Sequence, residues 1–154
     1  MKLSALYQIF LDCQSVTTDS RNCPDGSLFI ALKGESFNGN AFAKLALDSG
    51  CAFAIIDEIQ YAVEGDQRYI LVDDCLQTMQ QLANYHRRQL GTRVIGITGT
   101  NGKTTTKELI SSVLCQAHNV LYTLGNLNNH IGVPTTLLRL KPEHELAVIE
   151  MGAN

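Results

Sequence analysis

Apolar residues recur along the chain at two spacings, one typical of helices and one typical of buried strands. Leu3, Leu6, Ile9 and Phe10 recur at helical spacing, so the first dozen residues are predicted to form an amphipathic helix. Continuous apolar runs that indicate buried strands lie at residues 27–32, 52–56, 69–72, 93–98, 120–123 and 146–149. Further helices are predicted at residues 41–47, 74–90 and 103–117. Because strands alternate with helices, the pattern predicts an α/β fold.

The helix predicted at residues 74–90 marks a boundary between two domains. Asp74 is its predicted N-cap, with Gln77 three residues on as capping-box partner, and Gly91 ends it. After Gly91 the order becomes strand, glycine-rich loop, helix and strand, which is typical of a P-loop domain of Rossmann-like architecture. We therefore predict a small α/β domain at residues 1–91 and the first part of an ATP-binding domain at residues 92–154.

Composition and charge exclude several classes of function. Residues 1–90 hold 7 basic and 11 acidic side chains, and residues 91–154 hold 5 and 4, so the chain lacks the basic surface that nucleic acid requires. The five cysteines are scattered without a CxxC pair, which argues against a disulfide framework and a zinc site. The first fourteen residues are too polar for a signal peptide or a membrane span, so we expect a cytoplasmic protein without membrane insertion.

The strongest chemical signal is the segment Gly99–Thr104, with the sequence GTNGKT, which we call the phosphate loop. Phosphates need close backbone N–H donors, a helix N-terminus, a cation and a hydroxyl for Mg²⁺. Glycine lets the backbone approach closely, Lys103 supplies the charge and Thr104 can bind Mg²⁺. The residues expected to contact ATP are Gly99, Thr100, Asn101, Gly102, Lys103, Thr104 and Thr105.

The phosphate loop departs from the strict pattern GxxxxGK[ST], which would place glycine where Ile97 stands; the glycines are instead at positions 96 and 99. It is therefore a shortened variant. The alternative is a simple glycine turn with an incidental lysine, which the preceding strand and the following apolar helix disfavour. In that helix we expect four apolar residues to pack on the sheet: Leu109, Ile110, Val113 and Leu114.

Several motifs together resemble the Mur ligases. In the second domain they are GTNGKTTTKE at 99–108, LGNLNNHIGVPTTLL at 124–138 and AVIEMGAN at 147–154; in the first they are TDSR at 18–21 and GSLFIALKG at 26–34. The resemblance covers nearly the whole chain. Within the family it is most similar to the member that joins D-alanyl-D-alanine to UDP-N-acetylmuramoyl-tripeptide in peptidoglycan precursor synthesis.

The resemblance implies a reaction and a catalytic set. In this family ATP phosphorylates a peptide carboxylate, and an amine attacks the acyl phosphate to give an amide. Lys103 would neutralise the β- and γ-phosphates, while Thr104 and Glu150 would bind Mg²⁺. Strand-end carboxylates also suit ligand binding in open α/β sheets. The alternative for Glu150 is a solvated strand end.

The resemblance also implies two substrate-binding regions. Residues 124–131, here called the Asn loop, would bind the UDP-muramoyl substrate through Asn126, Asn128 and Asn129. Asparagines also favour turns, which is the alternative for each of them. In the first domain the nucleotide end of the substrate would contact Ser20, Arg21, Lys33 and Gly34. A purely structural Arg21 that holds a turn is the alternative there.

A Mur ligase of this type has three domains, so the resemblance implies that the chain stops inside the second. We expect no ligase activity from this polypeptide alone, and an unpaired sheet edge in its second domain. The complete enzyme is expected to be a monomer. Two other functions stay open: the sister ligase that adds the third peptide residue, and a UDP-sugar-binding module without catalysis.

Overall fold

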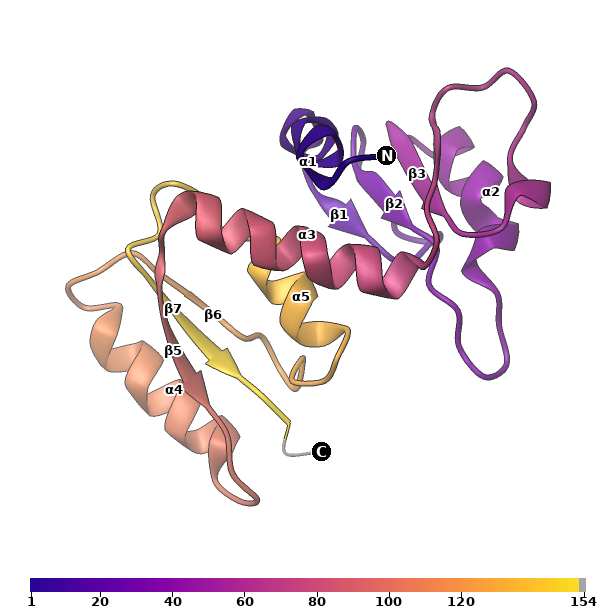
Figure 1. Cartoon of the computed structure of the whole chain (residues 1–154). Helices are drawn as coiled ribbons and strands as arrows, with labels where there is room; N and C mark the ends of the chain where they lie inside the picture. The colour runs from indigo at the N-terminus through magenta and orange to yellow at the C-terminus, as the bar shows by residue number, and fades with distance from the viewer. Residues whose placement is uncertain (153–154) are drawn as a thin grey trace. The chain divides into compact units, whose positions relative to one another are not determined.

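The computed structural model describes residues 1–152 of the chain and divides it into two compact units, Met1–Leu82 and Ala83–Asn154. The division falls within helix α3 (Cys75–Leu90), and the domain boundary expected near Gly91 lies at the end of the same helix. Within the described residues, no helix is both long and apolar enough to cross a membrane. Figure 1 shows both units, each with its own sheet.

The first unit is built on a four-stranded parallel sheet in the order β1-β2-β3-β4. Its strands β2 and β3 are almost wholly buried, because they come from the continuous apolar runs of the sequence. Strand β2 ends at Ile30 and is shorter than predicted, although Ala31 still donates to the carbonyl of Ile55 in β3. Lys33 then forms an isolated antiparallel bridge with Asn38. The elements of this unit are α1 (Leu3–Asp12), β1 (Val16–Thr17), β2 (Leu28–Ile30), η1 (Gly39–Phe42), α2 (Ala43–Asp48), β3 (Phe53–Ile56), η2 (Ile59–Tyr61) and β4 (Tyr69–Leu71).

The ends of helix α3 are fixed by the residues that the sequence predicts. The carboxylate of Asp74 accepts a hydrogen bond of 2.6 Å from the backbone N–H of Gln77, as an N-cap does. Gly91 follows the helix with φ of +66°, in the left-handed region that favours glycine. Both helix-end predictions are confirmed.

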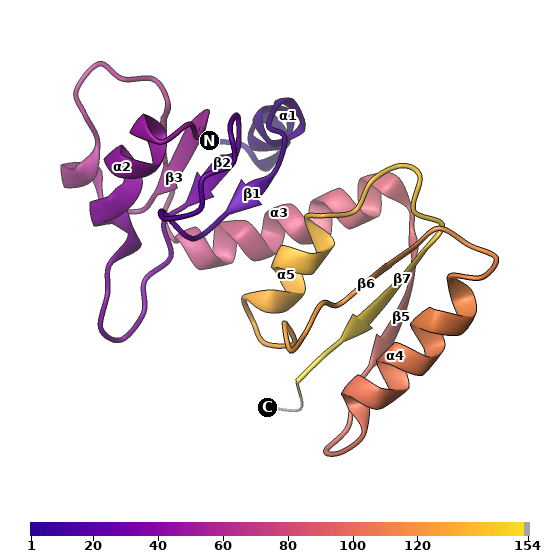
Figure 2. The same ribbon diagram turned by 180° about the vertical axis from the view of Figure 1, so that it is seen from behind.

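The second unit is a three-stranded parallel sheet with β7 in the middle, in the order β5-β7-β6. Helix α4 covers one face, where Ile110 and Leu114 pack on a core that includes Val148. Helix α5 and the end of α3 cover the other face. Figure 2 shows the molecule from behind, with α4 and α5 on opposite sides of the strands. The elements are β5 (Arg93–Ile97), α4 (Lys103–Leu114), β6 (Val120–Tyr122), α5 (Gly132–Leu137) and β7 (Leu146–Glu150).

The sequence-based assignment of the buried face of α4 was half wrong. Leu109 and Val113 are 63% and 69% exposed, whereas the buried residues of the helix are Lys107 and Ser111. A residue two positions along an α-helix is rotated by about 200°, so burial of positions 107 and 111 turns positions 109 and 113 outward. Only Ile110 and Leu114 of the four predicted residues pack against the sheet.

Candidate phosphate-binding site

The phosphate loop follows the carboxyl end of β5 and leads into α4. Since β5 and β7 are parallel, Ile97 at the end of β5 pairs with Glu150 at the end of β7. Figure 1 shows the two strands running in the same direction, with the loop at their carboxyl ends. This edge is where open α/β sheets bind ligands.

The backbone of the phosphate loop needs its two glycines. Gly99 and Gly102 have φ values of +142° and +74°, which residues with a Cβ rarely adopt. The ammonium of Lys103 folds back over the loop and donates a 2.6 Å hydrogen bond to the carbonyl of Gly99. The cation is thus held over the backbone that is expected to receive phosphate. Exposed side chains surround the loop: Thr100, Asn101, Thr104 and Thr105.

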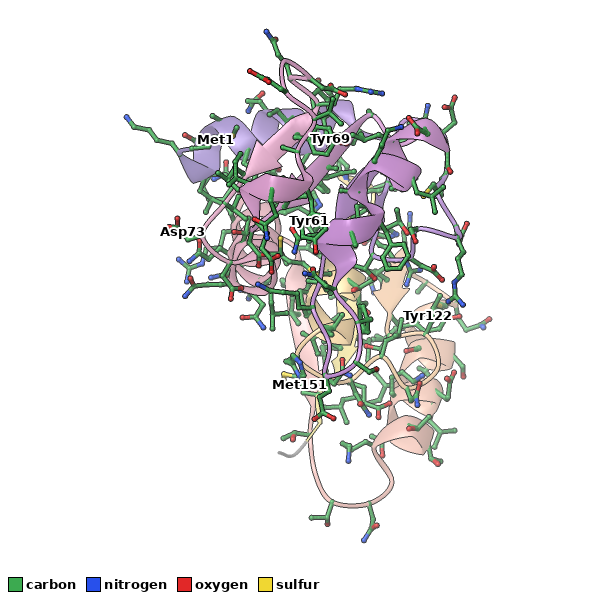
Figure 3. The ribbon with its side chains drawn as sticks, turned by 90° about the vertical axis from the view of Figure 1, so that its right-hand side faces the viewer. Met1, Tyr61, Tyr69, Asp73, Tyr122 and Met151 are labelled. Atoms are coloured by element: carbon green, nitrogen blue, oxygen red, sulfur yellow. The ribbon has the colours of Figure 1, made fainter. Side chains whose placement is uncertain are left out.

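The glycine at position 96, which distinguishes this loop from the strict pattern, lies beside the side chain of Met151. A Cβ on Gly96 would lie 2.7 Å from the methyl carbon of Met151. Met151, labelled in Figure 3, follows Glu150, and its N–H donates to the carbonyl of Ile97. A larger residue at position 96 would therefore displace only the end of the Met151 side chain, whereas Gly99 and Gly102 shape the loop through their φ values.

Glu150 is 1% exposed, and its two carboxylate oxygens have different surroundings. Oε1 accepts hydrogen bonds from the Thr104 hydroxyl at 3.2 Å and from the Asn128 amide at 2.8 Å. Oε2 is buried and has no hydrogen-bond partner among residues 1–152. The structure therefore brings Thr104 and Glu150, which were proposed together as Mg²⁺ ligands, into contact with Asn128, which was proposed for the substrate. A buried Glu150 replaces the alternative of a solvated strand end.

These residues fit Mg²⁺. A buried carboxylate oxygen without a partner is unfavourable unless a cation or donor reaches it. Glu150 Oε2 supplies that oxygen, and the hydroxyl of Thr104 lies against the same carboxylate. Among residues 1–152 no group of three or more His, Cys, Asp or Glu side chains could hold a metal. Mg²⁺ usually takes only one or two carboxylates and completes its shell with phosphates and water.

The Asn loop is fixed by its own side chains. The side-chain amide of Asn128 donates to Glu150, and the backbone carbonyl of Asn128 accepts a 2.6 Å hydrogen bond from the N–H of Gly152. Asn129 Oδ1 accepts from the N–H groups of Ile131 and Gly132, at 3.1 and 2.7 Å, and so caps α5. Asn126 is exposed. Asn128 and Asn129 thus have structural roles beside any contact with substrate.

Gly132, at the start of α5, lies against the Asn loop. A Cβ built on Gly132 would lie 2.5 Å from the carbonyl carbon of Leu127, which is backbone and cannot rotate away. The Asn loop therefore packs directly on the backbone of α5.

In the first unit, the residues predicted to bind the nucleotide end of the substrate follow neighbouring strands at one sheet edge. Arg21 makes a two-pronged ion pair with Asp19, through Nε and Nη2 at 2.9 Å each. These hydrogen bonds lower the pKa of Asp19 to about 2. Arg21 thus holds a turn, as the structural alternative expected. Ser20 lies in the same turn, and its carbonyl accepts from the thiol of Cys23.

Lys33 is likewise paired with acidic side chains. Its ammonium lies 3.1 Å from Asp57 and 3.5 Å from Glu58. Gly34 donates its N–H to the carbonyl of Phe37, and a Cβ at Gly34 would lie 2.3 Å from the ring of Phe37. Gly34 therefore makes room for an aromatic ring that is 55% exposed.

Sequence reasoning missed Lys107 and Thr123. Lys107 is fully buried and donates a 2.9 Å hydrogen bond to the carbonyl of Thr123. The hydroxyl of Thr123 in turn accepts from the N–H of Glu150 at 2.9 Å. A signal for Lys107 existed, because it shares the helical stripe of Ile110 and Leu114, which face the core.

The structure is an α/β fold with two parallel sheets, and two family models specify it further. The model described as "Mur ligase family, catalytic domain" matches residues 12–87, and "Mur ligase middle domain" matches residues 97–154. The chain belongs to the Mur ligase family. The domain boundary expected near Gly91 lies between the matched ranges.

Individual relatives narrow the comparison. The chain is 47% identical to the UDP-N-acetylmuramoyl-tripeptide–D-alanyl-D-alanine ligase of Bacillus subtilis, over 89% of this chain and 30% of that protein. A crystal structure of MurF from Acinetobacter baumannii matches with a TM-score of 0.86 and 36% identity, over 99% of this chain and 35% of that one. MurF ligase from Thermotoga maritima, solved in complex with ADP, matches with a TM-score of 0.81 and 31% identity, over 94% and 33%. The chain therefore spans about a third of the length of these proteins, and the predicted α/β fold is confirmed.

Proposed function

We propose that the chain supplies the phosphate loop and part of the substrate-binding surface of an ATP-dependent ligase that joins D-alanyl-D-alanine to UDP-N-acetylmuramoyl-tripeptide. The observation that carries this proposal is the convergence of Lys103, Thr104 and Glu150 at one sheet edge. The identity of 47% to the Bacillus subtilis ligase supports the choice of reaction, and the Thermotoga maritima structure with ADP supports the choice of nucleotide.

The proposed reaction forms an amide in two steps. The γ-phosphoryl group of ATP moves to the carboxylate of the tripeptide, which gives an acyl phosphate and ADP. The amine of D-alanyl-D-alanine then attacks the acyl carbon, and phosphate leaves. Lys103 would bind the β- and γ-phosphates, because its ammonium already lies over the loop backbone.

Thr104 and Glu150 would hold Mg²⁺, with Asn128 orienting the carboxylate. When bound, Mg²⁺ neutralises charge on the phosphate oxygens. The backbone N–H groups of the phosphate loop and the N-terminus of α4 favour the same anion. The chain thus offers the residue types that phosphoryl transfer requires, at the edge where the sheet collects ligands.

The Asn loop and the carboxyl edge of the first sheet would bind the UDP-muramoyl substrate, with Asn126 as the exposed amide of that loop. The same proposal places the protein in the cytoplasm as a monomer that serves peptidoglycan synthesis, and so cell shape and division. It includes neither nucleic acid binding nor membrane insertion.

The proposal is tested on the gene product that contains this chain. Phosphate release should require ATP, Mg²⁺, UDP-N-acetylmuramoyl-tripeptide and D-alanyl-D-alanine together. Release with UDP-N-acetylmuramoyl-dipeptide and a diamino acid instead would identify the sister ligase. Binding of the UDP-sugar without phosphate release under any combination would favour the binding module, for which the convergence of Lys103 and Glu150 gives no reason.

A further inference from the structure

Lys107 is a charged residue in an unusual place. Its side chain is 0% exposed, whereas the apolar residues Leu109 and Val113 of the same helix are exposed. Lys107 lies one helical turn after Lys103 of the phosphate loop. An ammonium is buried only where hydrogen bonds or opposite charge compensate the loss of water. The position of this cation therefore has a structural or functional reason.

The three N–H donors of Lys107 are matched by three acceptors. Two are carbonyls, of Thr123 at 2.9 Å and of Gly125 at 3.5 Å. The third is the carboxylate of Glu108 at 2.6 Å, whose side chain is 58% exposed. Both carbonyls belong to the segment that leads from β6 into the Asn loop, so the cation holds the root of that loop.

Lys107 also shares a helix face with a residue of the candidate site. Positions 104 and 107 are three apart in α4 and lie on the same side. Thr104 donates to Glu150 at the end of β7, while Lys107 donates to the chain at the end of β6. The first turns of α4 therefore contact the carboxyl ends of two strands at once.

A closed set of hydrogen bonds joins these contacts. The hydroxyl of Thr123 accepts from the N–H of Glu150, and the carboxylate of Glu150 accepts from Asn128 in the Asn loop. The Asn loop is thus fixed at its root by Lys107 and at its middle by Glu150. Without Lys107, the buried carbonyl of Thr123 would lose its donor, and the carbonyl of Gly125, which is exposed, would lose its link to α4.

We propose that Lys107 is a positioning residue for the muramoyl substrate: it holds the Asn loop in register with the phosphate loop and thereby sets the affinity of the Asn loop for its ligand. This inference rests on the proposed function for the identity of that ligand. An apolar side chain of the same length would fill the space but would leave the buried carbonyl of Thr123 without its donor.

The test uses the gene product with Lys107→Met, and with Lys141→Met as matched control because Lys141 is exposed. Dissociation constants are measured by calorimetry for UDP-N-acetylmuramoyl-tripeptide and, separately, for MgADP. We expect Lys107→Met to weaken the muramoyl ligand about tenfold or more and MgADP by less than about threefold, since only the Asn loop loses donors. Glu108→Gln should change neither constant by more than about twofold, because Glu108 is the exposed partner.

Amide hydrogen exchange gives a second readout that needs no ligand. Exchange at residues 124–131 should be at least about tenfold faster in Lys107→Met than in the wild type, with α4 unchanged. Equal loss of both affinities, or unchanged exchange in the Asn loop, would overturn the proposal. If Lys107→Met does not fold, Lys107→Gln, which keeps a donor but no charge, is measured in the same way. A wild-type protein that fails to bind the muramoyl ligand refutes the proposed function instead, and the exchange result still decides the role of Lys107.

Discussion

The two parallel sheets each end in charged side chains, but the two edges differ in what those side chains already bind. At the edge of the first sheet Arg21 is paired with Asp19, and Lys33 with Asp57 and Glu58. At the edge of the second, Glu150 keeps one buried oxygen that has no partner in the part of the chain that the structure describes. There the ammonium of Lys103 donates to a neutral carbonyl rather than to a carboxylate.

The difference separates a site that is ready for charged ligands from one whose charges are already neutralised. A phosphate or Mg²⁺ can bind at the second edge without breaking an ion pair. A pyrophosphate at the first edge has to replace Asp19 or Asp57 as the partner of its cation. We therefore expect substitutions at the second edge to have the larger functional effects, and those at the first edge to act more on stability.

The largest effect is expected for Lys103→Ala. Turnover of the gene product should fall by at least about a hundredfold, because a cation next to developing phosphate charge contributes several kcal/mol. Phosphate release under saturating substrates measures it, with Lys141→Ala as an exposed control. Turnover near the wild-type value would contradict the expectation that charged ligands bind at the edge of the second sheet.

Glu150→Gln should separate activity from stability. MgADP affinity should fall about tenfold, since the variant loses the charge at Oε2. Stability without Mg²⁺ should stay equal or rise, because a buried charged carboxylate, whose donors Thr104 and Asn128 are neutral, is replaced by a neutral amide. Thermal unfolding with and without MgADP measures both, and a variant that MgADP stabilises as strongly as the wild type would contradict the assignment.

Asp57→Asn tests the edge of the first sheet, where Lys33 is already paired with Asp57, through the free energy of unfolding. Burial alone would raise the pKa of Asp57, but hydrogen bonds from Asn40 and from the N–H of Cys75, together with Lys33, lower it below its ordinary value. A carboxyl with a lowered pKa stabilises the fold above its unfolded pKa of about 3.9, and this stability is lost as the pH falls further.

The variant should therefore be less stable than the wild type by about 1–3 kcal/mol at neutral pH, with the difference shrinking below about pH 4. Urea unfolding at several pH values measures it. Asp48→Asn is the control, because Asp48 forms only an exposed pair with Lys44. A difference that stays constant with pH would show that the charge of Asp57 is not responsible.

The smallest effect is expected for Arg21→Ala. Affinity for the UDP-muramoyl ligand should fall by only about threefold. In the wild type, a phosphate that binds Arg21 has to break the ion pair with Asp19, and this loss offsets most of the binding energy. Arg68→Ala is a close control: Arg68 pairs with Asp66 in the same i, i+2 geometry, but it precedes β4 and so lies at the opposite edge. Equal effects of the two substitutions on this affinity would mean that Arg21 only holds its turn and does not contact the ligand.

The elements that the sequence predicted well are those decided by local chemistry. Asp74 and Gly91 fix the ends of α3 through a cap and a left-handed φ, and both are readable from residue type. The phosphate loop is equally local, because glycine, lysine and threonine follow one another within six positions. Glu150 and Thr104 were assigned to one Mg²⁺ site from the family resemblance, and their hydrogen bond agrees with the rule that ligands gather at the carboxyl edge of parallel strands.

Features that depend on tertiary contacts were not predictable in the same way. Lysine is normally assigned to the surface. Lys107 is buried because it donates to the carbonyls of Thr123 and Gly125, which lie 16 and 18 positions further along the chain and cannot be foreseen from local sequence. That burial rotates α4 and exposes Leu109 and Val113, which the apolar pattern had placed inside. The neutralisation of Lys33 by Asp57 likewise joins the ends of two strands.

Gly132 shows how the Asn loop limits sequence variation outside itself. Since a single methyl group there would occupy the place of the Leu127 backbone, every other amino acid would displace the loop from Glu150. The restriction is steric, because the backbone φ of Gly132 is not in the left-handed region that favours glycine. The same position gives the engineer a steric control: one added carbon atom would shift the amides of the loop without touching their chemistry.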